Sequence, residues 1–408
     1  MGDKNYEKQH NRIDQGVFWT LIGLFVVPIY VRGMVIPTFY QINVFAVLGC
    51  LCVLYAVMHN GKLRKQDSIV YILISILTIL LAFSEIHAGR TAKGFIRVFC
   101  GLIMPLPLLY RRMYNPEKTI RIVVNCFKFV SVVIVVMGLI DYAMDHRLMV
   151  AYYALAHDLN YSNMAMSSMR LYSYIGHPLY NAELFLMTFS LTFLYSEYFK
   201  HNHEKDIWMI VVTMLGVAMT ASKSAIAIYL ALLIIFYIKN IKYMFLSITI
   251  LAIGYFNGIF DMVIERFSGS LTTGRAEVWE RISSRGITFF HFLWGNGSDS
   301  KYSYAYLEEW ARAAFEYPYR LYALEFGILF TIIIFIYLFF IPVIRMLKTK
   351  SNPGKMMFII TFLAITAHVN MYNGIGTYSD PLFLYTLFGC TLLNMNRLFE
   401  RNSLVYEQ

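Results

Sequence analysis

The chain has 408 residues, of which 58% are hydrophobic and only 15% are charged. Soluble domains carry about 25% charged residues, so this composition excludes a water-soluble globular protein. The formal net charge of +10 would suit a nucleic-acid-binding protein. The cations are instead distributed as in a membrane protein with positive cytoplasmic loops, and we expect no nucleic-acid partner.

Apolar segments recur along the whole chain at the length that a membrane-spanning helix requires, about 20 residues. We therefore predict one all-α polytopic membrane domain over residues 1–408, with about twelve transmembrane helices. A long polar and aromatic loop, 265–319, interrupts the pattern between the ninth and tenth spans. The predicted spans cover residues 17–36, 39–58, 68–86, 95–110, 121–143, 179–199, 207–221, 223–239, 243–264, 320–344, 356–375 and 381–396.

The positive charges between the spans predict which side each connection faces. Most lysines fall in connections on one side, together with both chain termini, and this side is predicted to be cytoplasmic. Of sixteen lysines only three fall on the opposite side, namely Lys93, Lys223 and Lys301. The large loop would therefore be extracytoplasmic.

Arginine, unlike lysine, is abundant on the predicted outer side. The planar guanidinium group binds phosphate with two parallel hydrogen bonds, which an ammonium group cannot do. We favour anion binding for the set, although any single arginine could form an ordinary salt bridge, as Arg281 could with Glu277 one helical turn away. The loop arginines are Arg266, Arg275, Arg281, Arg285, Arg312 and Arg320.

A second outer segment, 144–183, ends in the sequence RLYSYIGHPLYNAE. Pro178 suits the first turn of a helix, and Gly176 allows the turn before it. This structural role does not account for Arg170 and His177, because a cation at a helix N-terminus opposes the helix dipole unless an anion is bound there. A helix start and an anion site both remain open interpretations.

Lys223 lies in a polar break between two apolar spans, in the sequence TASKS at residues 220–224. A lysine this close to the hydrocarbon region is costly, and such a residue marks a functional site by default. The alternative is a lysine that extends its ammonium group to the membrane surface from a tight turn.

The large loop contains three recognisable segments. Residues 272–279, TTGRAEVW, predict a turn followed by an amphipathic helix, and residues 294–297, WGNG, predict a flexible turn. Residues 316–327 lead into the tenth span. Glu316 stands at a helix N-terminus beside Arg320, where a carboxylate is electrostatically favoured. It would act either as a helix cap or as a general base that deprotonates a hydroxyl group.

No metal or cofactor site is predicted. Asp299, Glu308 and Glu309 have no metal-ligand spacing, and we interpret them as a solvated acidic face. The cysteines all lie in apolar runs, which is typical of small buried hydrophobic residues and not of a disulfide framework. They are Cys50, Cys52, Cys100, Cys126 and Cys390.

The order of these segments resembles the O-antigen polymerase and O-antigen ligase superfamily, which includes capsule and exopolysaccharide polymerases. The segments that carry the resemblance are RLYSYIGHP, TASKS, GRAEVW, WGNG and EYPYRLYALEFG, within residues 165–330. The chain departs from the family at two positions. Lys223 stands where the family usually has arginine, and Glu316-Tyr317 stands where ligases commonly have a histidine. The second departure favours a polymerase.

The resemblance implies glycosyl transfer without a nucleotide sugar, on the outer face of the bacterial plasma membrane. The substrates would be oligosaccharide repeat units linked to undecaprenyl diphosphate among the membrane lipids, and the implied protein partners are a flippase and a chain-length regulator. By resemblance, Arg170, Lys223, Arg275 and Arg320 would bind the diphosphate. Arg275 would also be catalytic, with Glu316 or His177 as the base.

Two alternatives remain. A ligase of the same superfamily would transfer the finished glycan to another acceptor. A lipid-linked oligosaccharide flippase or exporter belongs to a different class and should carry charged residues deep in several spans to line a path. The predicted spans are nearly free of charge, so we expect a polymerase.

Overall fold

The computed structural model of the protein describes residues 13–37, 40–59, 65–168, 170–200, 206–238, 249, 274–308, 310–349, 354–376 and 379–406. Two predictions fall outside these residues: the ninth span at 243–264, apart from residue 249, and the first part of the large loop at 265–273.

The described residues form helices and no strand, and their one β-bridge joins Ser173 and Gly176. The first half of the chain contains η1 (Ile22–Val26), α2 (Ile29–Val35), α3 (Val44–His59), α4 (Lys65–His87), α5 (Ala92–Val98), η2 (Phe99–Ile103), η3 (Leu106–Leu108), α6 (Pro116–Ala143), α7 (Arg147–Leu155), α8 (Leu159–Ser168), α9 (Pro178–Tyr195) and η4 (Ser196–Lys200). The second half contains α10 (Trp208–Thr220), α11 (Lys223–Tyr237), α14 (Arg275–Ser283), η6 (Ser300–Tyr304), η7 (Ala311–Phe315), α15 (Pro318–Phe326), α16 (Ile328–Phe335), η8 (Ile336–Phe340), α17 (Ile341–Leu347), α18 (Lys355–Met371) and α19 (Ser379–Tyr406).

Three stretches of described helix are long and apolar enough to cross a membrane: Ser68–His87, Pro116–Ala143 and Ile328–Leu347. Four shorter apolar helices accompany them: Val44–Met58, Trp208–Thr220, Lys223–Tyr237 and Lys355–Met371. The prediction of an all-helical membrane protein is therefore confirmed in this general form. The number of twelve spans remains a prediction.

The first predicted span, 17–36, is not one straight helix. Helices Ile13–Val26 and Ile29–Val35 meet at an angle of 78°. Pro28 stands at the break, and because its ring nitrogen carries no hydrogen it cannot continue the helical hydrogen-bond pattern. A break of this kind leaves backbone groups without helical partners, and in a membrane interior each of them needs a partner from the protein.

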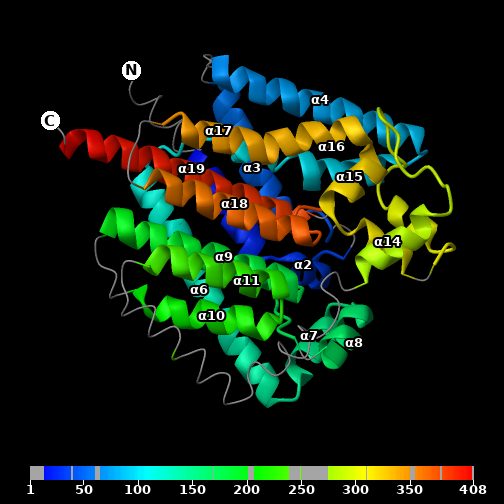
Figure 1. Cartoon of the computed structure of the whole chain (residues 1–408), viewed down its shortest axis with the longest axis horizontal. Helices are drawn as coiled ribbons and strands as arrows, with labels where there is room; N and C mark the ends of the chain where they lie inside the picture. Colours follow the sequence, from blue (N-terminus) through cyan, green and yellow to red (C-terminus); the bar gives the residue numbers. More distant parts are fainter. Residues whose placement is uncertain are drawn as a thin grey trace.

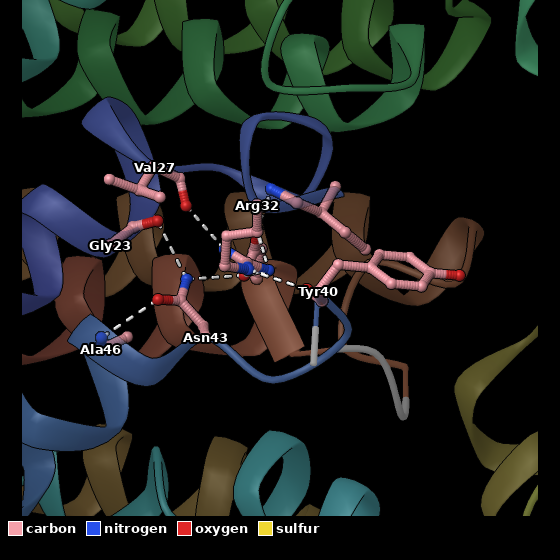
Figure 2. Close-up of polar contacts among 8 residues, drawn as sticks. Gly23, Val27, Arg32, Tyr40, Asn43 and Ala46 are labelled. Atoms are coloured by element: carbon pink, nitrogen blue, oxygen red, sulfur yellow. Dashed lines mark hydrogen bonds and ion pairs between the residues drawn. The ribbon is translucent and has the colours of Figure 1, made fainter. Parts of the chain in front are cut away.

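Arg32 supplies several of these partners (Figure 2). Its side chain is 2% exposed. Its guanidinium donates to the carbonyl oxygens of Val27 and Tyr40, both at 2.8 Å, and to both carboxylate oxygens of Asp380 at 2.9 and 3.1 Å. Asn43 donates to the same carboxylate at 2.7 Å. We call Arg32, its partner Asp380 and the contacting residues Val27, Tyr40 and Asn43 the Arg32 network.

The Arg32 network joins the broken first helix to two distant elements. Asp380 lies in the first turn of α19 and also accepts a hydrogen bond from the backbone nitrogen of Ile29, the first residue of α2, at 3.1 Å. Asn43 precedes α3 and donates to the carbonyl of Gly23 at 3.0 Å. The backbone groups that the break leaves without helical partners are thus hydrogen-bonded by side chains, some of which come from distant parts of the chain.

Helix α9 forms the centre of the bundle. Every residue from Tyr180 to Tyr195 is buried, and the helix packs against α6, α10, α11, α18 and α19. At one end of the bundle lie α7, α8, α14 and α15, while the end of α17, the start of α18 and the last turns of α19 lie at the other (Figure 1). We call the first of these the loop end.

The loop end is folded into regular structure. Residues 144–168, predicted as an outer connection, form the short helices α7 and α8. The described part of the large loop has a hydrophobic core of its own, made of Val278, Ile282, Phe289, Ala311, Ala314, Phe315 and Leu324. The predicted tenth span, 320–344, is also divided, because Gly327 separates α15 from α16.

Candidate functional site

Arg275 and Glu316, both predicted site residues, form an ion pair in the large loop. The predicted amphipathic helix is confirmed as α14, and Arg275 is its first residue. The Arg275 Nε donates to Glu316 Oε2 at 2.7 Å, and the Nη2 lies 2.5 Å from the same oxygen. The two side chains are 19% and 37% exposed. The pair therefore borders solvent and remains accessible to a ligand.

This pair changes the interpretation of Glu316. The residue at the N-cap position of α15 is Tyr317, and no side chain caps this helix. Glu316 is therefore not a helix cap, and its carboxylate is bound by the arginine of another helix. Its carboxylate could act as a base only when Arg275 releases it.

Arg320 lies beside the same ion pair. Its guanidinium carbon is 4.3 Å from the centre of the Trp279 ring and 5.3 Å from that of Tyr317. Arg275 approaches the same Tyr317 ring at 5.9 Å. Arg320 also donates to the carbonyl oxygen of Ala314 at 3.2 Å. Aromatic faces stabilise guanidinium groups without neutralising them, so the two arginines and Glu316 together carry a formal charge of +1.

Arg170 and Lys223 both lie at a second position, the turn between α10 and α11. Arg170 is 8% exposed, and its Nε donates to the carbonyl oxygen of Thr220 at 2.8 Å. Lys223 is the first residue of α11, directly after the N-cap Ser222. Both cations thus flank the N-terminus of one helix, where the backbone N–H groups favour an anion.

His177 is the N-cap of α9, and Pro178 follows in the first turn as predicted. The His177 Nδ1 accepts a hydrogen bond from the backbone nitrogen of Leu179 at 3.2 Å. Its ring also packs edge-to-face against Tyr161 and Tyr172. The capping contact gives His177 a structural role that the sequence had left unexplained, and it occupies the nitrogen that a base would use.

The end of α18 connects these groups, although none of its residues was predicted as a site residue. His368 Nδ1 lies 3.3 Å from the hydroxyl of Ser224, next to Lys223. The carbonyl oxygen of Met371 accepts from Arg275 at 3.4 Å, and the hydroxyl of Tyr372 donates to the carboxylate of Glu183. One turn of α18 therefore touches the 220–224 turn, the large loop and α9.

Two polar atoms in this region are buried without a hydrogen-bond partner among the described residues, His368 Nε2 and Glu183 Oε1. Both side chains are fully buried. A buried polar atom in this situation costs free energy and often marks a functional site. The sequence did contain a signal, since polar residues interrupt the apolar pattern at the end of the eleventh predicted span, in the sequence HVNMYNG at 368–374.

Two further predictions for the loop need correction. The segment 294–297 is not a flexible turn. The Gly295 nitrogen donates to the Ser84 hydroxyl at 3.1 Å, and the Asn296 nitrogen donates to the Leu324 carbonyl at 2.8 Å. The segment is therefore fixed between α4 and α15.

Arg281, suggested as a partner for Glu277, forms its ion pair with Glu308, while the charge of Glu277 also acts on it. The hydrogen bonds between Arg281 and Glu308 lower the pKa of Glu308 and raise the pKa of Arg281. This arginine therefore holds the loop together.

Comparison of the chain with protein-family models, curated proteins and solved structures found no match. Within the described residues, no group of three or more His, Cys, Asp or Glu side chains is placed to hold a metal ion. The functional interpretation therefore depends on the cations at the loop end.

Proposed function

We propose that the protein polymerises oligosaccharide repeat units linked to a polyprenyl diphosphate, at the outer face of the bacterial plasma membrane. The observation that carries the proposal is that Arg275 and Lys223 lie in segments joined by the same turn of α18. Arg320 and Arg170 accompany them. Four cations at one end of a membrane bundle suit a ligand with several negative charges.

The proposed reaction needs few protein groups. A hydroxyl oxygen of one lipid-linked unit forms a bond to the anomeric carbon of a second unit, and the bond from that carbon to the diphosphate oxygen breaks. The diphosphate leaves with the bonding electron pair, and the hydroxyl proton passes to a base. Cations placed where charge develops lower the barrier of such a step.

The ion pair of Arg275 and Glu316 suits both halves of this reaction. When the guanidinium turns to the diphosphate, the carboxylate loses its partner and becomes able to accept the hydroxyl proton. Glu316 is the better supported base, because His177 already uses its Nδ1 in the cap of α9. The partners that fit this proposal are a flippase that delivers the lipid-linked units and a chain-length regulator. In this proposal both termini of the chain lie in the cytoplasm.

One observation favours a second candidate, a lipid-linked oligosaccharide flippase. The prediction that the spans are nearly free of charge is too simple, since Glu183, Arg32 and Asp380 are buried among the described helices. Charged groups inside a bundle are what a transport path requires. The Arg32–Asp380 pair, however, is neutralised by its own contacts, and Glu183 is bound by Tyr372. We therefore retain the polymerase as the main proposal and the ligase as its variant.

The first test is the size and location of lipid-linked glycans in membranes of a deletion strain. A polymerase predicts single repeat units that accumulate on the lipid carrier at the outer face. Long chains that stay attached to the carrier would instead indicate a ligase. Single units confined to the cytoplasmic face would indicate a flippase and would overturn the polymerase proposal.

Arg275→Ala should lower the rate of polymer formation about 10²–10³-fold, the usual effect of removing one group that stabilises developing negative charge. The matched control is Arg285→Ala, which removes another arginine exposed on the loop. Membrane levels of both variants would be measured by immunoblot. Normal polymer in Arg275→Ala at normal protein levels would remove Arg275 from the site.

A further inference from the structure

A cavity with charged side chains in its walls lies at the loop end, away from the Arg275–Glu316 pair. It has a volume of about 700 Å³, and its charged lining residues are Arg90, Lys93, Arg97 and Asp299. Three cations and one carboxylate give these lining residues a formal charge of +2. The volume lies within the range of about 300–1,000 Å³ that is usual for small-molecule sites. We call this cavity the Arg90 pocket.

The walls of the Arg90 pocket are fixed by buried contacts. Ser298 donates through both its backbone nitrogen and its hydroxyl to the carboxylate of Glu85, at 2.6 and 3.0 Å. The backbone nitrogen of Asp299 donates to Glu325 at 3.0 Å. Glu85 and Glu325 are 1% and 0% exposed. Two carboxylates from α4 and α15 therefore hold the 298–299 wall in place.

Arg97 joins the remaining walls. It donates to the side-chain oxygen of Gln41 at 3.1 Å, and it forms an ion pair with Asp299. The backbone next to Gln41 is in turn fixed by the Arg32 network, because Arg32 donates to the carbonyl of Tyr40. A pocket with fixed walls requires little rearrangement when it binds a ligand, and this preserves affinity.

Arg90 and Lys93 are the two cations that these contacts do not use. Their side chains are exposed, and neither forms a hydrogen bond or an ion pair with any residue that the structure describes. Arg90 follows the turn at Gly89, whose φ of +65° suits glycine, and Lys93 lies in the first turn of α5. Two unpaired cations at the mouth of a preformed pocket favour an anionic ligand.

The position of the pocket indicates that the ligand is a lipid. Helix α4 is one of the apolar helices long enough to span a membrane, and it ends at His87, directly before the pocket. Exposed apolar side chains follow one side of this helix up to its end, namely Ile72, Ile79, Phe83 and Ile86. Such a side faces lipid tails, so the pocket begins where lipid headgroups would be.

We propose that the Arg90 pocket binds the phosphate or diphosphate group of a membrane lipid, with Arg90 and Lys93 as the main contacts. The shared chemistry is a lipid phosphate, which a polyprenyl diphosphate and an anionic phospholipid both provide. The inference does not depend on the proposed glycosyl transfer. If the ligand is a polyprenyl diphosphate, the pocket provides a place for a second lipid-linked unit beside the one at Arg275.

The test is native mass spectrometry of the full chain, titrated in separate arms with undecaprenyl diphosphate and with phosphatidylglycerol. The method counts the lipids bound to each chain, so a lipid at Arg275 does not hide one at the pocket. We expect the double variant Arg90→Gln/Lys93→Gln to bind one fewer lipid, with the affinity of the pocket at least about tenfold weaker. Lys93→Arg, which keeps the charge, should bind as the wild type does, and so should the control Arg285→Gln.

Each outcome decides the inference. A loss confined to undecaprenyl diphosphate supports the pocket and identifies the lipid carrier as its ligand, whereas a loss confined to phosphatidylglycerol supports it and identifies a phospholipid headgroup. Binding of both lipids by the double variant as by the wild type would overturn the inference, as would a wild-type chain that binds neither. Polymer formation is not the measured quantity, so a failure here leaves the polymerase proposal untouched, and a failed polymerase proposal leaves the pocket untouched.

Discussion

The Arg32 network should be the most sensitive point of the fold. Arg32→Met removes the guanidinium and leaves the carboxylate of Asp380, whose side chain is 5% exposed, without its cation. The carbonyls of Val27 and Tyr40 lose their donors in the same step. Removing one partner of a buried ion pair costs about 3–5 kcal/mol. We expect about 3 kcal/mol here, because an unfolded chain in a membrane also finds polar partners.

The assay is thermal unfolding of the detergent-purified protein, with Arg90→Gln as the control because Arg90 is exposed and unpaired among the described residues. Arg32→Lys should rescue little, since one ammonium nitrogen cannot reproduce the four contacts that the guanidinium makes from three nitrogens. The double variant Arg32→Met/Asp380→Asn should lose less stability than the sum of the single changes, because it leaves no buried charge. Unfolding of Arg32→Met at the wild-type temperature, or strictly additive losses in the double variant, would refute this reasoning.

Two further predictions concern the loop. Gly295→Ala should destabilise the loop by about 1–3 kcal/mol or more, because an added Cβ would lie 2.1 Å from the backbone carbon of Glu325. Limited proteolysis should then cleave the loop faster than in the wild type. An unchanged rate of cleavage would mean that the segment 294–297 is not fixed. The pKa of Glu308 is lower in the folded protein than its ordinary value of 4.5, so the stability of the loop should depend on pH. The ionised carboxylate stabilises the folded loop at pH values above 4.5, and this stabilisation is lost as the pH falls through the pKa of the folded state. The hydrogen-exchange protection factors of α14, which correct for the intrinsic effect of pH, should therefore fall in acid, and Glu308→Gln should remove that fall; the same fall in both proteins would contradict the assignment.

Much of the fold could be predicted because apolar runs of the right length are a strong signal for membrane helices. The helix at α14 and the helix start at Pro178 were also predictable, since each has a local signature of turn residue and helix former. The break at Pro28 was not predicted, because the apolar run continues through it. Only the contact between Arg32 and Asp380, far apart in the sequence, explains why a break is tolerated there.

The candidate site was predictable residue by residue but not as an arrangement. Arginines at unusual positions could be singled out from the sequence, yet their partners lie on other elements, as Glu316 does for Arg275. His368 and Glu183 were missed because both lie inside predicted spans, where the sequence does not show that their helices pack against each other. The Arg90 pocket was missed for a related reason: its walls come from three separate segments that only the fold brings together.

The polymerase proposal can be tested with the purified protein in proteoliposomes, supplied only with single lipid-linked repeat units extracted from the deletion strain and with no nucleotide sugar. If the protein is a polymerase, we expect a ladder of longer lipid-linked glycans, with one polyprenyl diphosphate released for each linkage formed. We also expect Arg275→Ala to form this ladder about 10²–10³-fold more slowly under the same conditions. Units that remain single with the wild-type protein, or an equal ladder with Arg275→Ala, would contradict the account.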